Sequence, residues 1–401
     1  MRSKFFHAVA IAGIFALAGC SDDSGSNLTA LTNGPDNKEA ASDPEEDETT
    51  TKDKSNHEDE TDISNPEDST EPGESSPSGV LSSSNSGLLQ SSSSESAQEQ
   101  TYAFGYALGN APRKSKGCGS ASKLQKTNSV ENGDRFEMNS GNETREFFIT
   151  LPKNYDNAKP YKLLFAMHCM GSKAEDFVHH YPDYDHPSPY YGQQNLDKNG
   201  DYIFVAPRGD TDGWPWSLNS SKDHVFINEL LTLLEENYCI DTTRVFATGF
   251  SFGAMFTNSL AWDLQDRLRA VAMYAPVAEV IFLPQNTGKP IAWMAVHGKA
   301  DGTCIYSHDR DVALAQILKN NSAEGKDATK EQLEEIPDNT AGHVCHDFKD
   351  VDPRFPVKFC SWNGPHRWPA HDEWDYAEYE HTTSWQKSWV PKTVHDFFEQ
   401  F

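Results

Sequence analysis

The chain has 401 residues, with 61 acidic and 34 basic side chains and a formal net charge of −27. Most of the excess acid lies in residues 21–100, which carry 20 acidic residues and only three lysines. No segment gathers basic residues, so the composition excludes the usual class of nucleic-acid-binding proteins. Aromatic residues and regular apolar patterns fall almost entirely within residues 101–401, where we predict one large folded domain.

The first 20 residues are typical of an export signal. Arg2 and Lys4 precede an apolar run over residues 5–18, which is short for a membrane span but suits a signal peptide. Residues 17–20 read LAGC and resemble the lipobox of bacterial lipoproteins. We therefore expect lipidation of Cys20 and an extracytoplasmic protein, anchored to a membrane at the cell envelope or secreted. A plain signal peptide is the alternative.

Residues 21–100 form a region without any apolar periodicity. They consist mainly of Ser, Asp, Glu, Thr, Asn and Pro. Such a composition cannot bury enough apolar surface to offset the conformational entropy of the chain. We expect a disordered spacer that holds the folded domain away from its anchor and has no binding function of its own.

Short apolar runs alternate with helix-like segments from residue 101 onward. We expect strands over residues 145–151, 162–168, 202–206, 244–248, 270–274, 291–296 and 356–361. We expect helices over residues 225–238, 252–264, 312–318 and 394–401. This alternation predicts an α/β fold, a mostly parallel sheet flanked by helices, with its functional groups at the carboxyl ends of the strands.

The pentapeptide Gly249-Phe250-Ser251-Phe252-Gly253 fits the pattern G-x-S-x-G. It lies between a predicted strand and a predicted helix, which is where a nucleophilic serine is exposed on a sharp turn. The residue after such a serine presents its backbone N–H at the start of the helix, where it can bind an oxyanion. We predict that Ser251 is the nucleophile and that Phe252 supplies an oxyanion-hole donor. An ordinary serine in a turn is the alternative.

A nucleophilic serine needs a histidine base and an acid that orients the base. Asp301 follows a predicted strand in the order Ser, acid, His that this type of fold uses, so we predict that it is the acid. Seven histidines follow Asp301, and His366 lies in a loop directly after the last predicted strand. We predict that His366 is the base. His371 is a nearby competitor, and His395 falls in the terminal helix.

Two further loops at strand ends contain candidates for the second oxyanion-hole donor and for substrate binding. The loop after residues 162–168 contains Met170, whose backbone N–H is the expected second oxyanion-hole donor, with Cys169 as the alternative. Trp214 and Trp216 follow another predicted strand and could stack on an aromatic acyl group or a sugar. The alternative for these two residues is that they pack their own loop.

Six cysteines remain if Cys20 is lipidated, and export makes up to three disulfides possible. Cys345 and Cys360 are the closest pair and the one we predict. No Cys-x-x-Cys motif or histidine cluster has the spacing of a metal site, so we expect neither a metal nor a cofactor.

Four blocks of this sequence resemble the polyhydroxybutyrate-depolymerase-like esterases, which include feruloyl esterases and acetylxylan esterases. They are Cys118 within Gly-Cys-Gly, the stretch Cys239–Gly253, His297-Gly298-x-x-Asp301, and Trp362–Pro369. The resemblance covers roughly residues 116–401. It implies an α/β-hydrolase fold and ester hydrolysis outside the cytoplasm without a metal. Pro365 and Cys169 depart from the family pattern, which usually has glycine at both positions.

Taken with the aromatic loops, the resemblance predicts a serine esterase that removes feruloyl groups from arabinoxylan. Acetylxylan esterase and polyhydroxybutyrate depolymerase are the alternatives within the family. A non-catalytic surface-binding lipoprotein is the alternative outside it. The expected partner is feruloylated or acetylated plant cell-wall polysaccharide, and we expect a monomer.

Overall fold

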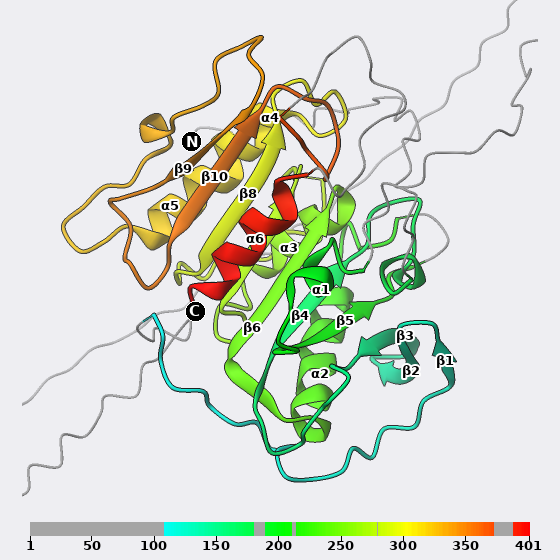
Figure 1. Ribbon diagram of the computed structural model, residues 1–401. Helices are drawn as coiled ribbons and strands as arrows, with labels where there is room; N and C mark the ends of the chain where they lie inside the picture. The colour runs from blue at the N-terminus through cyan, green and yellow to red at the C-terminus, as the bar shows by residue number, and fades with distance from the viewer. Residues whose placement is uncertain (1–107, 180–188, 211–213, 279, 373–387) are drawn as a thin grey trace, which may run out of the picture. The chain divides into compact units, whose positions relative to one another are not determined.

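The computed structural model describes residues 108–401 except 180–188, 211–213, 279 and 373–387 (Figure 1). The predicted signal, Cys20 and the spacer lie outside the described residues. Within the described part of the chain, no helix is long and apolar enough to cross a membrane.

A ten-stranded sheet forms the centre of the domain. Its strands lie side by side in the order β1-β2-β3-β5-β4-β6-β7-β8-β10-β9. Their bounds are β1 Asn128–Val130, β2 Gly133–Ser140, β3 Glu143–Thr150, β4 Tyr161–Met167, β5 Tyr202–Pro207, β6 Ile240–Phe250, β7 Ala270–Tyr274, β8 Ala292–Gly298, β9 His343–Asp347 and β10 Val357–Trp362.

The middle of the sheet is parallel and its two margins are antiparallel. Strands β5, β4, β6, β7, β8 and β10 pair in parallel, whereas β1, β2 and β3 form an antiparallel margin at one side and β9 at the other. Strands β5, β7 and β8 are buried along their whole length, and β4 is buried except at Lys162, which explains why their sequences are mostly apolar. The predicted α/β-hydrolase type of fold is confirmed.

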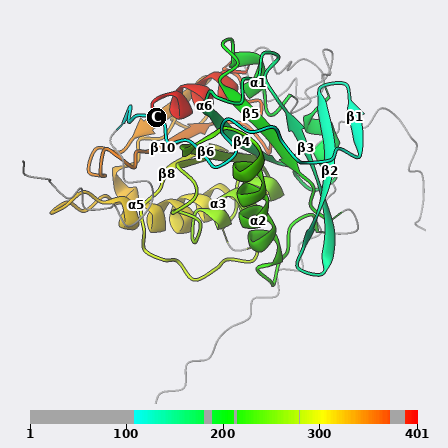
Figure 2. The same ribbon diagram turned by 90° about the horizontal axis from the view of Figure 1, so that it is seen from below.

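Helices cover both faces of the sheet (Figure 2). α2, α3 and α5 lie on one face, and α1 and α6 lie on the other. The bounds of the α-helices are α1 Gln193–Leu196, α2 Lys222–Asn237, α3 Phe252–Leu260, α4 Tyr306–His308, α5 Ala315–Asn321 and α6 Val390–Glu399. α6 has a proline in its first turn, where the missing N–H costs no hydrogen bond.

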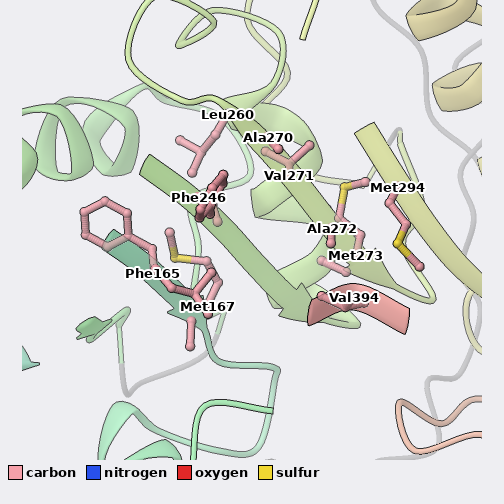
Figure 3. Packing of buried hydrophobic residues seen from close by; sticks show 14 of the residues in the cluster. Phe165, Met167, Phe246, Leu260, Ala270, Val271, Ala272, Met273, Met294 and Val394 are labelled. Atoms are coloured by element: carbon pink, nitrogen blue, oxygen red, sulfur yellow. The ribbon is translucent and has the colours of Figure 1, made fainter. Parts of the chain in front are cut away.

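The core fills the space between the sheet and these helices. Figure 3 shows side chains of Phe165, Phe246 and Met273 from neighbouring strands, together with Leu260 of α3 and Val394 of α6. All five side chains are fully buried. Since both faces of the sheet are covered, the strand ends are where polar side chains can meet solvent and substrate.

Two disulfides hold the described domain together. Cys345 and Cys360 pair between β9 and β10, as predicted, and Cys118 pairs with Cys239 just before β6. Cys304 is a free, buried thiol, so the six cysteines do not form three pairs. Disulfides form and persist in oxidising compartments, which indicates that the domain folds outside the reducing cytosol.

Three strands and one π-helical segment were not predicted from the sequence. β1 and β9 are the two edge strands and β2 lies next to β1; all three are mostly exposed or half-buried, so they carry no long apolar run. Between α4 and α5 the chain forms a π-helical segment, Asp309–Leu314, where an ordinary helix was expected nearby. Such segments frequently occur near functional sites.

Candidate active site

Ser251 lies on the turn between β6 and α3, at the carboxyl end of the sheet. Its φ of 53° is positive, a strained conformation for a residue with a side chain. Gly253 makes the turn possible, because a Cβ there would lie 2.1 Å from the main-chain oxygen of Met167. A Cβ at Gly249 would lie 2.4 Å from the main-chain oxygen of Gly253. Both glycines of the motif are therefore required by close backbone contact.

The structure brings the three predicted side chains Ser251, His366 and Asp301 together in a chain of hydrogen bonds. His366 Nε2 lies 2.9 Å from Ser251 Oγ, and His366 Nδ1 lies 2.7 Å from Asp301 Oδ2. An ionised carboxylate can only accept, so Nδ1 carries the proton and Nε2 offers its lone pair to the serine hydroxyl. This is the arrangement in which histidine can take the proton of a nucleophilic serine.

Asp301 is fixed by hydrogen bonds to both carboxylate oxygens. Its Oδ1 accepts the backbone N–H groups of Thr303, at 2.8 Å, and Cys304, at 2.7 Å. Burial alone would raise the pKa of Asp301, but hydrogen bonds from His297 and His366 outweigh burial and hold that pKa well below its usual range. The carboxylate is therefore ionised at every pH at which the protein is expected to work.

The two candidate oxyanion donors come from neighbouring strand ends. Phe252 is the first residue of α3, where backbone N–H groups have no acceptor within the helix. Met170 follows β4 and is half-buried. Because the start of α3 packs directly on the main chain of Met167, the loop after β4 and the turn at Ser251 meet at the same end of the sheet.

His168 braces the loop after β4, a role that the sequence did not reveal. Its Nδ1 donates to the main-chain oxygen of Cys169 at 3.0 Å, and its Nε2 accepts the N–H of Gly209 at 2.9 Å. These two partners require the neutral ring. Burial is the main cause that lowers the pKa of His168 to about 4.

Tyr191 links the two halves of the site and was also missed. Its buried hydroxyl donates to the main-chain oxygen of Met167 at 2.8 Å and accepts the N–H of Phe250 at 2.9 Å. Met167 precedes the Met170 loop and Phe250 precedes Ser251. One hydroxyl therefore fixes the spacing between the strand that leads to the Met170 loop and the strand that leads to Ser251.

Backbone hydrogen bonds join the acid loop to the histidine loop. The N–H of Lys299 donates to the oxygen of Trp362 at 2.8 Å, and the N–H of Ala300 donates to the oxygen of Gly364 at 3.1 Å. These bonds hold Asp301 and His366 in register. Both hydrogen bonds of His366 form although Pro365 directly precedes it in the chain.

The two predicted substrate tryptophans have different surroundings. Trp214 is 40% exposed and its ring stacks on that of Phe252, next to Ser251. Trp216 has no exposed surface, stacks on Phe256, and donates its indole N–H to the main-chain oxygen of His168 at 2.9 Å. We therefore correct the expectation for Trp216, which packs against the loop after β4 and has no face left for a substrate.

A second Ser-His-Asp set occurs in the described residues and cannot perform the same chemistry. His224 lies 2.8 Å from Ser259 Oγ and 2.9 Å from Asp263. However, Ser259 is fully buried in α3 and donates its proton to the main-chain oxygen of Phe282. The proton of Ser259 is therefore held by a main-chain oxygen, and its hydroxyl is closed off from any substrate. Among the serines that the structure describes, only Ser251 combines these distances with a strained, partly exposed turn.

Known proteins of similar sequence include several named as feruloyl esterases. The chain is 31% identical over 268 residues to "Probable feruloyl esterase C" of Aspergillus terreus, a match that covers 66% of this chain and 88% of that protein. It is 32% identical over 216 residues to "Feruloyl esterase D" of Neurospora crassa, covering 52% of this chain and 69% of that protein.

Similar solved structures include an acetyl xylan esterase from Aspergillus awamori, with 17% identity and a TM-score of 0.46, which covers 67% of this chain and 100% of that one. A ferulic acid esterase from Anaeromyces mucronatus has 21% identity and a TM-score of 0.37, covering 48% of this chain and 83% of that one. No protein-family model matches the chain. The sequence identity and coverage with the Aspergillus terreus protein show that this chain belongs to the feruloyl esterase family.

Proposed function

We propose that this protein is a serine esterase that releases hydroxycinnamoyl groups such as ferulate from plant cell-wall polysaccharide. The observation that carries the proposal is the hydrogen-bonded chain of Ser251, His366 and Asp301 on a strained turn at the end of the sheet. The proposal is also supported by the names of the relatives, which are feruloyl esterases.

The proposed reaction is a two-step acyl transfer. His366 accepts the Ser251 proton as the hydroxyl attacks the ester carbonyl, and Asp301 stabilises the imidazolium that forms. The N–H groups of Phe252 and Met170 bind the oxyanion. His366 then gives the proton to the leaving sugar hydroxyl. Water, activated by the same histidine, finally attacks the acyl-enzyme and releases the acid.

Trp214 is proposed to bind the aromatic part of the acyl group. Its half-exposed ring, stacked on Phe252, presents an apolar face beside the nucleophile. An aromatic ring placed on such a face gains both burial and stacking, about 1 kcal/mol for the stacking beyond burial. An acetyl group is too small to use this surface.

The test compares methyl ferulate, acetylated xylan and a short hydroxybutyrate oligomer as substrates for the purified protein. We expect methyl ferulate to have the highest kcat/KM, and we expect Trp214→Ala to raise KM for ferulate about tenfold with little change for an acetyl ester. A preference for acetylated xylan that Trp214→Ala leaves unchanged would make the protein an acetylxylan esterase. A preference for the oligomer would indicate a polyester depolymerase.

We also propose that the protein is held at the cell envelope through Cys20. The support is the LAGC sequence at residues 17–20 and the acidic, Ser-rich residues 21–100, which suit a spacer. The domain itself, residues 101–401, is proposed to act as a monomer at the end of that spacer. We expect the wild-type protein to incorporate a clickable palmitate analogue in its host and Cys20→Ala to incorporate none. Incorporation that persists in Cys20→Ala would refute the anchor.

A further inference from the structure

Behind the Ser251-His366-Asp301 array lies a second, fully buried pair of titratable side chains, His297 and Asp309. His297 is the penultimate residue of β8, and Asp309 opens the π-helical segment. His297 Nδ1 lies 2.9 Å from Asp309 Oδ2, and its Nε2 lies 3.4 Å from Asp301 Oδ2. Asp309, His297, Asp301 and His366 therefore form one continuous series of buried polar contacts.

The hydrogen bonds of His297 determine where its protons lie. Its Nε2 is 2.8 Å from the main-chain oxygen of Cys304, which can only accept, so Nε2 carries a proton that also faces Asp301. Its Nδ1 faces a carboxylate oxygen of Asp309. Burial opposes a charged ring, but the hydrogen bonds to Asp301 and Asp309 outweigh burial and raise the pKa of His297 to about 9.

The groups that face His297 include two carboxylates and no second cation among the described residues. Asp301 and Asp309 are both buried, and one oxygen of Asp309 accepts no hydrogen bond from the described residues. The Cys304 thiol is also buried, and burial raises its pKa well above the ordinary value. The ring of Tyr306 meets His297 edge-on at 5.4 Å, and its hydroxyl points to Glu335. His297 therefore balances the charge of this cluster.

We propose that His297 is a positioning residue for the acid of the proposed esterase reaction. It pins the loop that carries Asp301 through the main-chain oxygen of Cys304, and its positive charge faces Asp301 Oδ2, the same oxygen that accepts the hydrogen bond from His366. This inference rests on the proposed function of the Ser251-His366-Asp301 array and extends it to a fourth and a fifth residue. His366 then faces a carboxylate whose position and negative charge are both influenced by His297.

The variant His297→Gln removes the charge and keeps an N–H donor for the Cys304 oxygen. Loss of a positive charge near His366 favours protonation of the base, so the acid limb of kcat/KM moves to higher pH. The expected displacement is about one pH unit, as for a like charge close to a titrating group. An acid limb within about 0.2 units of the wild type would overturn the inference.

His224→Gln is the matched control, because it removes another buried histidine that pairs with an aspartate, Asp263. We expect a lower Tm in both variants and a displaced acid limb only in His297→Gln. Equal displacement in the two variants would mean that general loss of packing moves the limb and would also overturn the inference.

A measurement on the wild type decides the question if His297→Gln does not fold. In 15N-labelled protein both ring nitrogens of His297 are expected to have the chemical shifts of protonated nitrogens from pH 5 to pH 8. A bare ring nitrogen at pH 7 would contradict the proposal. Wild-type activity on methyl ferulate and its loss in Ser251→Ala test the proposed function separately, so the two can fail independently.

Discussion

Gly253 has no side chain at the point where the main-chain oxygen of Met167 approaches it, and a Cβ at Gly253 would lie 2.1 Å from that oxygen. This contact sets the distance between the start of α3 and the end of β4. The two backbone N–H groups predicted to bind the oxyanion, those of Phe252 and Met170, come from these two segments. The geometry of the site therefore depends on a contact that contains no reacting group.

Gly253→Ala is expected to remove activity and to lower stability by several kcal/mol, because backbone must move to admit the methyl group. Gly302→Ala is the control, since a Cβ at Gly302 would meet no atom within 4 Å. Thermal unfolding and kcat/KM on methyl ferulate measure both effects. Near-wild-type activity in Gly253→Ala would show that this contact does not set the site.

Tyr191→Phe is expected to lower stability by about 2 kcal/mol and to reduce kcat, because the main-chain groups of Met167 and Phe250 lose a shared buried partner. Tyr190→Phe is the control: Tyr190 is equally buried, but its hydroxyl meets the Thr150 hydroxyl, which keeps its own bond to the main-chain oxygen of Asn132. An equal loss of kcat in the two variants would argue against a specific link through Tyr191.

The stability of the protein is expected to fall in acid because of His168. Its folded-state pKa of about 4 lies below the ordinary value of 6.5, so the unfolded chain binds a proton first as the pH falls. Stability is lost between these two pH values, by up to about 3 kcal/mol. His297, with a raised pKa of about 9, contributes stability that is present below pH 6.5 and lost as the pH rises toward 9.

Thermal unfolding of the wild type from pH 4 to pH 9 should therefore give the highest Tm near neutrality. His168→Gln should be less stable at pH 7 but should lose less stability between pH 6.5 and pH 4 than the wild type. An unchanged acid slope in His168→Gln would mean that other groups cause the loss in acid.

Asp301→Asn is expected to lower kcat about 10⁴-fold with the fold intact, because an amide cannot enforce the same His366 tautomer or stabilise the imidazolium. The measurement is kcat on methyl ferulate together with a near-ultraviolet circular dichroism spectrum. Turnover within tenfold of the wild type would mean that another residue serves as the acid.

The sequence predicted the sheet and the meeting of Ser251, Asp301 and His366 well, because each follows a largely buried strand of the parallel part of the sheet. The carboxyl ends of such strands necessarily lie at one edge. Trp216 was predicted wrongly because its exposure depends on the loop that folds over it, and its indole bonds to His168, 48 residues earlier. No local sequence pattern predicts a contact between residues so far apart in the chain.

The roles of Tyr191 and His297 were not predictable for the same reason. Tyr191 reaches Phe250 across 59 residues of sequence, and an aromatic residue in a loop looks the same whether it links two strands or lies in solvent. His297 was part of a recognised block, but its partner Asp309 belongs to a π-helical segment that the expected helix over residues 312–318 did not include. The hairpin of β1 and β2 was not predicted from the sequence because its strands are largely polar.

Labelling with a fluorophosphonate probe tests the central proposal most directly, with Ser259→Ala as the control for the second, buried Ser-His-Asp set. We expect one label on the wild type and on Ser259→Ala, located at Ser251, and hydrolysis of methyl ferulate by both proteins. We expect Ser251→Ala to take no label and to lose about 10⁶-fold in kcat. A label at another residue, or turnover by Ser251→Ala within tenfold of the wild type, would contradict the proposed function.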